Sequence, residues 1–195
     1  PIAQLLKDMA SRSLPSFSWV SPSYESSGTL PGADFGPTSM HPGDGCPLSG
    51  DALVGVLYNA LLNSPSWEDT ALLIVFDENG GLPDHRMGDR TVAPGGSVPL
   101  KPSGVPWYDG QPPNPPSVDF DFKTLGVRVP AVLISPWVEK GVDPTPYDHS
   151  SIPATVKTQF NLKDFLTLRD EAAGNFLSKL LSKPRTDCKP LPTRT

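Results

Sequence analysis

Six consecutive apolar residues at positions 71–76, Ala-Leu-Leu-Ile-Val-Phe, stand out from a mixed sequence. A run of this length without polar alternation predicts a strand buried on both faces, which is typical of a parallel sheet. Asp77 and Glu78 follow it directly, and Gly80 and Gly81 allow the backbone to turn sharply. Because ligands of open α/β sheets bind beyond the carboxyl ends of the strands, this pattern predicts a functional site. The alternative is that the acidic residues only form a turn or cap a helix.

The clearest helical pattern precedes this strand. Between Asp51 and Asn63, apolar residues recur every three or four positions and form a stripe suited to packing on a sheet. Ser49 is the expected N-cap, and Pro65 ends the helix. A helix, a short loop and a buried strand in this order predict one arm of an α/β unit with a parallel sheet.

A second strand is expected over residues 127–135. Pro130 has no N–H group, so either this strand pairs fully only from Ala131 onward or its edge is exposed. Its last residues, 135–137, are expected at the same end of the sheet as Asp77. The other expected elements are a short amphipathic helix, an alternating strand and two C-terminal helices, at residues 2–10, 14–20, 152–160 and 167–181.

Two long segments rich in proline and glycine separate these elements, at residues 21–50 and 86–120. Loops of this length are uncommon in compact domains unless they serve a function. The first contains His41, which Pro42 follows. The second carries eight prolines, so we expect it to be irregular. It forms either a rim or lid over the site or a tolerated surface insertion.

Composition narrows the classes of partner. A chain of 195 residues fits one domain, and a net charge of −5 without any basic run argues against nucleic acid. No apolar stretch reaches the roughly 18 residues of a membrane span. No signal peptide is recognisable, although a chain that begins at Pro1 says nothing about a leader.

Cys46 and Cys188 either pair in an oxidising compartment or stay free. Residues 183–195 have little to bury and are expected to form a mobile tail.

The acidic pair belongs to a longer motif, Asp-Glu-Asn-Gly-Gly-x-x-Asp-His, at residues 77–85. Gly-Val-Arg-Val-Pro at 126–130 and Ser-Pro-Trp at 135–137 follow in order. Ser-Met-His-Pro at 39–42 precedes them, and a block at 149–162 closes the series. Together these motifs resemble the signature blocks of the phosphoesterase family, which contains the non-specific phospholipases C and a group of acid phosphatases. The resemblance covers most of the chain.

The resemblance implies roles for five residues. Asp77 and Glu78 look like the metal-binding acidic pair, so a divalent metal ion of unknown identity is the expected cofactor. His41 looks like the imidazole that contacts the phosphoryl group or serves the leaving alcohol. His85 and His149 match further family positions, where they either touch the substrate or brace loops.

Two neighbouring groups have competing interpretations. Asp84 either orients His85 or is only a turn-forming residue. Residues 148–151, Asp-His-Ser-Ser, contain the letters of a serine-hydrolase triad. Adjacent residues rarely have that geometry, however, and the chain has no Gly-x-Ser-x-Gly motif. Ser150 and Ser151 are therefore expected to cap the following helix, with Pro153 in its first turn.

Two blocks of the family have no counterpart here. One is Glu-Asn-Arg-Ser-Phe-Asp, which supplies further metal ligands, and the other is Thr-x-Pro-Asn-Arg, which brings the nucleophilic hydroxyl in the phospholipase branch. Both lie upstream in the family's order. Residues 1–182 are therefore expected to be the C-terminal portion of a phosphoesterase catalytic domain. The fold class implied is α/β, as a partial α/β/α sandwich resembling the alkaline phosphatase and sulfatase superfamily. The isolated chain is expected to be inactive and poorly stable.

The resemblance implies a hydrolase acting on phosphate esters, as a phospholipase C-type phosphodiesterase that releases diacylglycerol and a phosphorylated head group. The block at 149–162 and Glu78 favour this over an acid phosphatase of the same family. The other alternative is an inactive fragment or paralogue that binds a partner or a lipid head group. The expected partner is a phospholipid or a small phosphate ester, with peripheral contact to a membrane surface. Oligomeric state and compartment stay open, with a secreted or peripheral membrane location favoured.

Overall fold

The structure is a computed structural model that describes residues 2–24, 37–43, 45–95 and 122–191. The chain divides into two compact units, which are described separately below. Unit 1 comprises residues 1–76, 130–140 and 180–195, and unit 2 comprises residues 77–129 and 141–179. The predicted loop at 86–120 lies mostly outside the described residues, as does part of the loop at 21–50.

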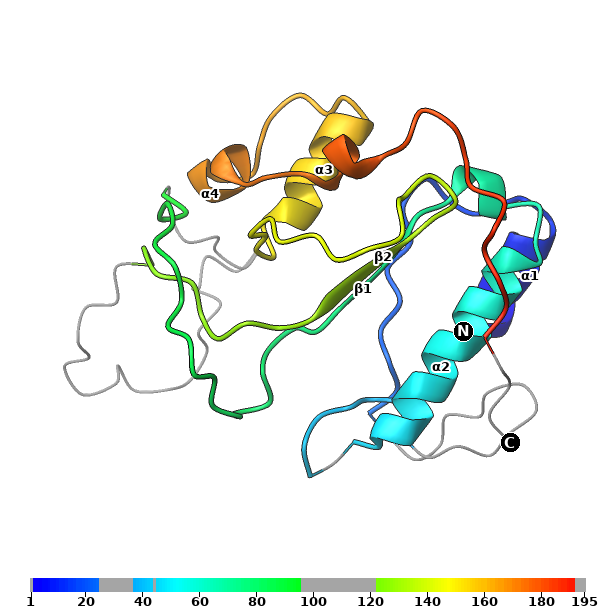
Figure 1. The fold of residues 1–195 in the computed structure, drawn as a ribbon, viewed down its shortest axis with the longest axis horizontal. Helices are drawn as coiled ribbons and strands as arrows, with labels where there is room; N and C mark the ends of the chain where they lie inside the picture. The colour runs from blue at the N-terminus through cyan, green and yellow to red at the C-terminus, as the bar shows by residue number, and fades with distance from the viewer. Residues whose placement is uncertain (1, 25–36, 44, 96–121, 192–195) are drawn as a thin grey trace, which may run out of the picture. The chain divides into compact units, whose positions relative to one another are not determined.

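The core of unit 1 lies between two helices, α1 (Ile2–Ala10) and α2 (Pro47–Leu62), which run side by side (Figure 1). Met9, Leu57 and Leu61 are buried at its centre. Partly buried apolar side chains surround them: Ile2, Leu5, Leu6, Leu14, Leu53, Ala60, Trp67 and Leu72. The apolar stripe predicted from periodicity therefore packs mainly on another helix.

The start of α2 corrects the sequence prediction. The helix begins at Pro47, four residues before the predicted Asp51, with Cys46 as its N-cap. Proline suits the first helical position because its missing N–H group would have no intrahelical partner there. Ser49, the predicted N-cap, is buried within the first turn. The preceding loop thus ends at Cys46, and both cysteines of the chain are free thiols.

The strand predicted over residues 14–20 does not form. Phe17 and Trp19, two of the apolar residues of its alternating pattern, are 50% and 73% exposed. An alternating segment becomes a strand only when a neighbouring strand pairs with it. In the described part of the chain, the only named strands are paired with each other.

Those two strands are β1 (Leu72–Val75) and β2 (Ala131–Ile134), which pair antiparallel. The predicted parallel sheet is wrong for this pair, because an apolar run reports burial and does not fix the direction of the neighbouring strand. All four residues of β1 are also only half-buried. The start of β2 at Ala131 confirms the prediction made from Pro130. The chain is therefore a mixed structure of helices and a small antiparallel sheet, which is compatible with the α/β class.

The antiparallel register separates two segments that were expected together. Leu72 pairs with Ile134, so the residues after β2 lie beside the start of β1. The Ser135 hydroxyl accordingly donates to the Thr70 carbonyl at 3.0 Å. Asp77 follows the other end of β1, so the prediction that Ser135 and Asp77 share one end of the sheet is wrong.

The C-terminal residues of unit 1 lie along α2. The Tyr58 hydroxyl donates to the Lys189 carbonyl at 2.7 Å. Asn59 exchanges two hydrogen bonds with the backbone of Leu191, at 2.9 and 3.1 Å. These bonds hold the described end of the tail that the sequence predicts to be mobile, and its mobility stays a prediction for experiment.

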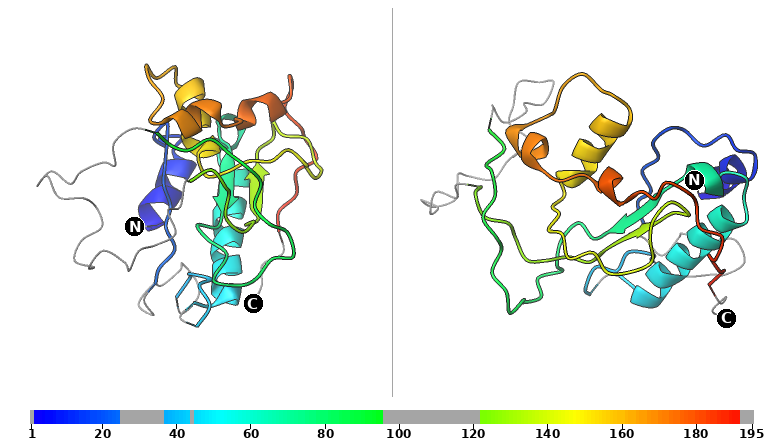
Figure 2. Two further views of the ribbon diagram at one scale, coloured as in Figure 1. Left: turned by 90° about the vertical axis from the view of Figure 1, so that its left-hand side faces the viewer. Right: turned by 45° about the horizontal axis from the view of Figure 1, so that its top comes forward.

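Three described helices belong to unit 2: α3 (Ser151–Gln159), α4 (Leu168–Ala172) and the 3-10 helix η2 (Phe176–Lys179) (Figure 2). A further 3-10 helix, η1 (Trp67–Asp69), belongs to unit 1. The helix predicted at 152–160 is confirmed by α3. The single helix predicted at 167–181 is wrong, because Ala173 has extended backbone angles that end α4. No helix in the described ranges combines the length and the apolar character needed to cross a membrane.

Arg169 of α4 joins two backbone segments of unit 2. Its guanidinium donates to the Val92 carbonyl at 2.8 Å and to the Phe122 carbonyl. The N–H group of Thr91 donates to the Lys123 carbonyl at 2.9 Å. Residues 91–92 and 122–123 are therefore tied together, although residues 92 and 122 are 30 positions apart in the sequence.

Candidate functional site

The acidic pair forms a tight turn directly after β1. One oxygen of the Asp77 carboxylate accepts the Glu78 N–H group at 3.0 Å, and one of Glu78 accepts the Gly80 N–H group at 3.1 Å. Gly80 and Gly81 have φ angles of 66° and 74°, which side chains with a Cβ disfavour. Both carboxylates are exposed. The turn-forming interpretation is thus correct as far as it goes, while metal binding stays a prediction.

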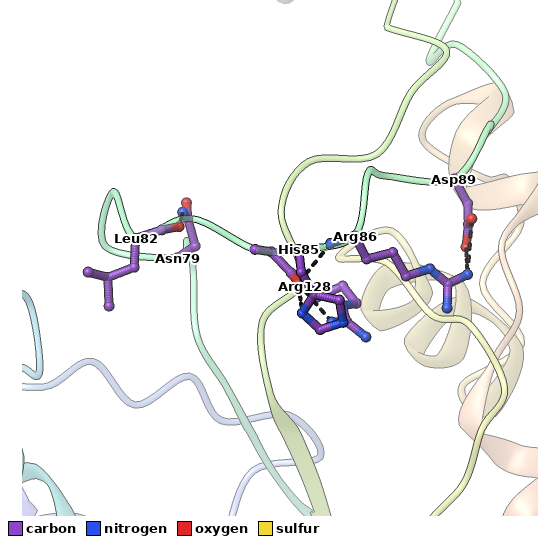
Figure 3. Close-up of polar contacts among 7 residues, drawn as sticks. Asn79, Leu82, His85, Arg86, Asp89 and Arg128 are labelled. Atoms are coloured by element: carbon purple, nitrogen blue, oxygen red, sulfur yellow. Dashed lines mark hydrogen bonds and ion pairs between the residues drawn. The ribbon is translucent and has the colours of Figure 1, made fainter.

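Asn79 closes the same turn. Its side-chain amide donates to the Leu82 carbonyl at 2.5 Å, and the Leu82 N–H group donates back to the Asn79 carbonyl at 3.3 Å (Figure 3). The loop that carries the two carboxylates is therefore held by its own polar groups before it reaches Asp84.

Asp84 is bound from two sides by strong donors. Arg128 donates to both of its carboxylate oxygens, from Nε at 2.7 Å and from Nη2 at 2.8 Å (Figure 3). The Arg86 N–H group adds a third bond at 3.1 Å. The Asp84 side chain is only 12% exposed. The hydrogen bonds from Arg128 hold the pKa of Asp84 well below its usual range, and the same pair raises the pKa of Arg128.

His85 lies against this pair. Its Nδ1 is 3.3 Å from Oδ1 of Asp84, and its side chain is 88% exposed (Figure 3). This contact fits the orienting interpretation of Asp84, and the bond from the Arg86 N–H group fits the turn-forming one, so the role of Asp84 stays a prediction. An exposed ring with one nitrogen beside a carboxylate keeps its other nitrogen, Nε2, accessible to a ligand.

His41 belongs to unit 1, in a turn that precedes α2. Its carbonyl accepts the Gly45 N–H group at 2.8 Å, and the Cys46 N–H group donates to the Ser39 carbonyl at 2.8 Å. A Cβ atom at Gly45 would collide with the backbone of Ser39 and His41, so this turn requires glycine. The structure thus gives the His-Pro motif a defined backbone. Its proximity to Asp77, which belongs to unit 2, stays a prediction.

His149 lies at the start of α3. The Asp148 carboxylate accepts the Ser150 N–H group at 2.7 Å, and the Asp148 carbonyl accepts that of Ser151 at 2.9 Å. Ser150 is the N-cap residue, as predicted, but its side chain makes no capping bond. Ser151 is 1% exposed, and its hydroxyl accepts the Asp148 N–H group. A buried hydroxyl engaged in the turn agrees with a capping segment and disfavours a nucleophile.

We compared the sequence that carries these motifs with known protein families. The model of the family described as "Phosphoesterase family" matches residues 1–163. This chain belongs to the phosphoesterase family.

Its relatives include plant and bacterial proteins. Non-specific phospholipase C4 of Arabidopsis thaliana is 46% identical over 149 residues, which are 71% of this chain and 25% of that protein. Non-specific phospholipase C6 of the same plant is 39% identical over 194 residues, or 93% of this chain and 34% of that protein. Non-hemolytic phospholipase C of Pseudomonas aeruginosa is 30% identical over 172 residues, which are 82% of this chain and 22% of that protein. This phosphoesterase chain therefore spans a quarter to a third of the Arabidopsis relatives.

Sequence reasoning gave no role to Arg128, although it lies inside the Gly-Val-Arg-Val-Pro motif of this phosphoesterase. It also missed the cluster around Asp143, whose carboxylate accepts hydrogen bonds from Thr145, Tyr147 and Lys179 at 2.7–3.1 Å. Hydrogen bonds from Thr145, and then from Lys179, lower the pKa of Asp143. The Asp-x-Thr spacing is a recognisable turn signal. The neighbouring sequence does not predict the contact with Lys179, which lies 36 residues away.

The donor set of this phosphoesterase suits a divalent metal only in part. The exposed carboxylates of Asp77 and Glu78 are the hard oxygen donors that such an ion prefers. Within residues 2–24, 37–43, 45–95 and 122–191, no three His, Cys, Asp or Glu side chains come together as a metal-binding group. Metal binding by Asp77 and Glu78 therefore stays a prediction that needs further ligands.

Proposed function

We propose that this chain supplies the acidic pair and the imidazoles of a phospholipase C-type active site. The enzyme would hydrolyse the phosphodiester bond of a phospholipid and release diacylglycerol and a phosphorylated head group. One observation carries the proposal: the region that matches the phosphoesterase family contains the Asp77–Glu78 turn, held directly after β1 with both carboxylates exposed. Relatives named as phospholipases C from a plant and a bacterium support the substrate class.

Each proposed group has a distinct task. Asp77 and Glu78 hold a divalent metal ion together with ligands from outside the described residues. Such an ion, when bound, neutralises phosphate charge and stabilises the charge that develops on oxygen. His41 binds the phosphoryl oxygens or gives a proton to the leaving alcohol, which suits an imidazole near neutral pH. His85 and His149 touch the substrate or brace the loops around it.

The complete enzyme would be an α/β/α sandwich of the alkaline phosphatase kind, of which this chain forms part. By itself the chain would be inactive and poorly stable. Support comes from its span of a quarter to a third of the Arabidopsis relatives, from the half-buried β1 and from the lack of a group of three metal ligands among the described residues. A strand suited to burial needs further neighbours, because exposed apolar faces and open edges favour aggregation.

Contact with a membrane surface is a further part of the proposal. It is supported by three exposed aromatic side chains in unit 1, Phe17, Trp19 and Tyr24, at 50%, 73% and 65% exposure. Tryptophan and tyrosine suit a lipid interface because each combines an apolar ring with a polar group. Flotation with phosphatidylcholine vesicles should recover less of a Trp19→Ala variant than of the wild type.

A chimaera tests the proposed activity. In non-specific phospholipase C6 of Arabidopsis, the segment matched over 93% of this chain would be replaced by residues 1–195. We expect the chimaera to hydrolyse phospholipid vesicles, while the isolated chain does not. Asp77→Asn should abolish this activity in the chimaera. Asp187→Asn, which changes an exposed carboxylate in the C-terminal segment, is the matched control and should keep it.

Other outcomes select the alternatives. A chimaera that hydrolyses a soluble phosphate monoester but no phospholipid would indicate an acid phosphatase. A folded chimaera that binds vesicles without hydrolysing either substrate would indicate a chain with a binding role only.

A further inference from the structure

The Asp84 carboxylate lies between a guanidinium and an imidazole. Arg128 binds both of its oxygens at 2.7 and 2.8 Å, while Nδ1 of His85 lies 3.3 Å from Oδ1 (Figure 3). Arg128 comes from the segment that leads into β2, 44 residues after Asp84. The contact between Arg128 and Asp84 therefore joins two parts of unit 2 beside the His85 ring.

The two-pronged contact fixes the plane of the carboxylate. A guanidinium that donates to both oxygens restricts the orientation of the acceptor, unlike a lysine ammonium, which acts as a point charge. Asp84 is 12% exposed, whereas His85 is 88% exposed. A partly buried carboxylate thus lies beside one ring nitrogen, while most of the ring is exposed.

Among the residues that the structure describes, the neighbouring guanidinium of Arg86 does not compete for this carboxylate. The guanidinium of Arg86 is bound to both oxygens of Asp89 at 3.1 and 3.2 Å, and only the backbone N–H group of Arg86 reaches Asp84. The Asp89 charge also acts favourably on Arg128 and adds to the rise in its pKa. These described charges thus form two ion pairs, and the pair made by Asp84 and Arg128 is the one that contacts the His85 ring.

We propose that Arg128 is a positioning residue for His85. It acts through Asp84, which holds the imidazole as the tautomer protonated at Nδ1 and leaves Nε2 to face the substrate. The hydrogen bond made by one ring nitrogen decides the tautomer and therefore the chemistry of the other. The kinetic consequence rests on the proposed function, whereas the tautomer itself does not.

The tautomer can be measured without any assay of activity. The chain contains three histidines, so an imidazole ¹⁵N spectrum holds three sets of signals. His41→Gln and His149→Gln variants assign them. At a pH where the imidazoles are neutral, we expect His85 to be protonated at Nδ1 and unprotonated at Nε2. A His85 ring protonated at Nε2 in the wild type would overturn the proposal.

Variants of the guanidinium test its part. In Arg128→Gln we expect His85 to shift toward the tautomer protonated at Nε2. Arg128→Lys keeps the charge but cannot donate to both carboxylate oxygens in the same way, so its tautomer ratio should lie between those of the wild type and Arg128→Gln. Arg86→Gln is the matched control, because it removes an exposed ion pair of the same loop and should leave His85 unchanged. If Arg128→Gln also disturbs the signals of His41 and His149, the Lys variant decides. An unchanged His85 in that variant would refute the proposal.

The catalytic consequence is measured in the chimaera. We expect Arg128→Gln to lower kcat on the order of tenfold, as losses of such orienting partners do, with little change in KM. In a His85→Gln background the same substitution should have no further effect on kcat, because Arg128 acts only through His85. Full additivity of the two losses would contradict the proposal. An inactive wild-type chimaera would instead reject the proposed function and leave the tautomer result standing.

Discussion

Leu61 is the best point at which to test how the core of unit 1 is built. It is 1% exposed and packs with Met9 and Leu57 between α1 and α2. Leu61→Ala removes three carbon groups, and about 0.8 kcal/mol for each gives a transfer loss of about 2.4 kcal/mol. The cavity left behind adds roughly 1 kcal/mol, because two helices close over it only in part. We expect a loss in free energy of unfolding of about 3 kcal/mol.

The measurement is urea denaturation followed by circular dichroism. Leu48→Ala is the matched control, since Leu48 lies on the same helix but is 70% exposed. That control should change stability by less than about 0.5 kcal/mol. In a thermal experiment the Leu61 variant should melt roughly 6–12 °C lower, at 2–4 °C per kcal/mol for a chain of this size. If the two variants differ by less than about 1 kcal/mol, the helical pair is not the core of unit 1.

Three other predictions concern the site and the tail. In the chimaera, Asp77→Asn should reduce phospholipid turnover by more than tenfold, a barrier increase above about 1.4 kcal/mol, while the melting temperature stays unchanged. Because Arg128 lowers the pKa of Asp84 in the folded state, their pair should stabilise the protein fully above about pH 4 and lose its effect as acid reaches the lowered pKa. The stability difference between wild type and Asp84→Asn, measured by urea denaturation, should therefore shrink from pH 7 to pH 2. Tyr58→Phe removes the bond to the Lys189 carbonyl and should cost about 1 kcal/mol, with faster proteolysis of the tail as the readout.

Local signals predicted much of the fold. The apolar periodicity located α2, the unbroken apolar run located β1, and the missing N–H group of Pro130 fixed the start of β2. Each of these depends on residues close together in sequence. The direction of β2 relative to β1 depends instead on the path of residues 77–129, about which local composition says nothing.

Two other errors have the same origin. Residues 14–20 have the alternation of a strand, but a strand also needs a partner, which the described chain does not provide. The helix predicted at 167–181 has suitable residues, but Ala173 is extended. Just beyond it, the Phe176 N–H group donates to the Thr155 side chain at 3.0 Å. Contact with α3 thus overrides local propensity.

The site shows the same division. The turn at Asp77 and Glu78 and the contact between Asp84 and His85 follow from neighbouring residues and were predictable from sequence. The pairing of Asp84 with Arg128 spans 44 residues and became visible only in the structure. No local rule selects which of several arginines approaches a given aspartate.

The hydrogen bonds that Arg169 makes to two backbone segments bear on how much the sequence between those segments can change. They fix the carbonyls of Val92 and Phe122, so the chain enters and leaves the intervening segment at set points. Once the ends of a loop are fixed, doubling its length costs only about 0.6 kcal/mol of closure entropy. Insertions, deletions or grafted sequences between these two anchors should therefore leave the body of unit 2 intact.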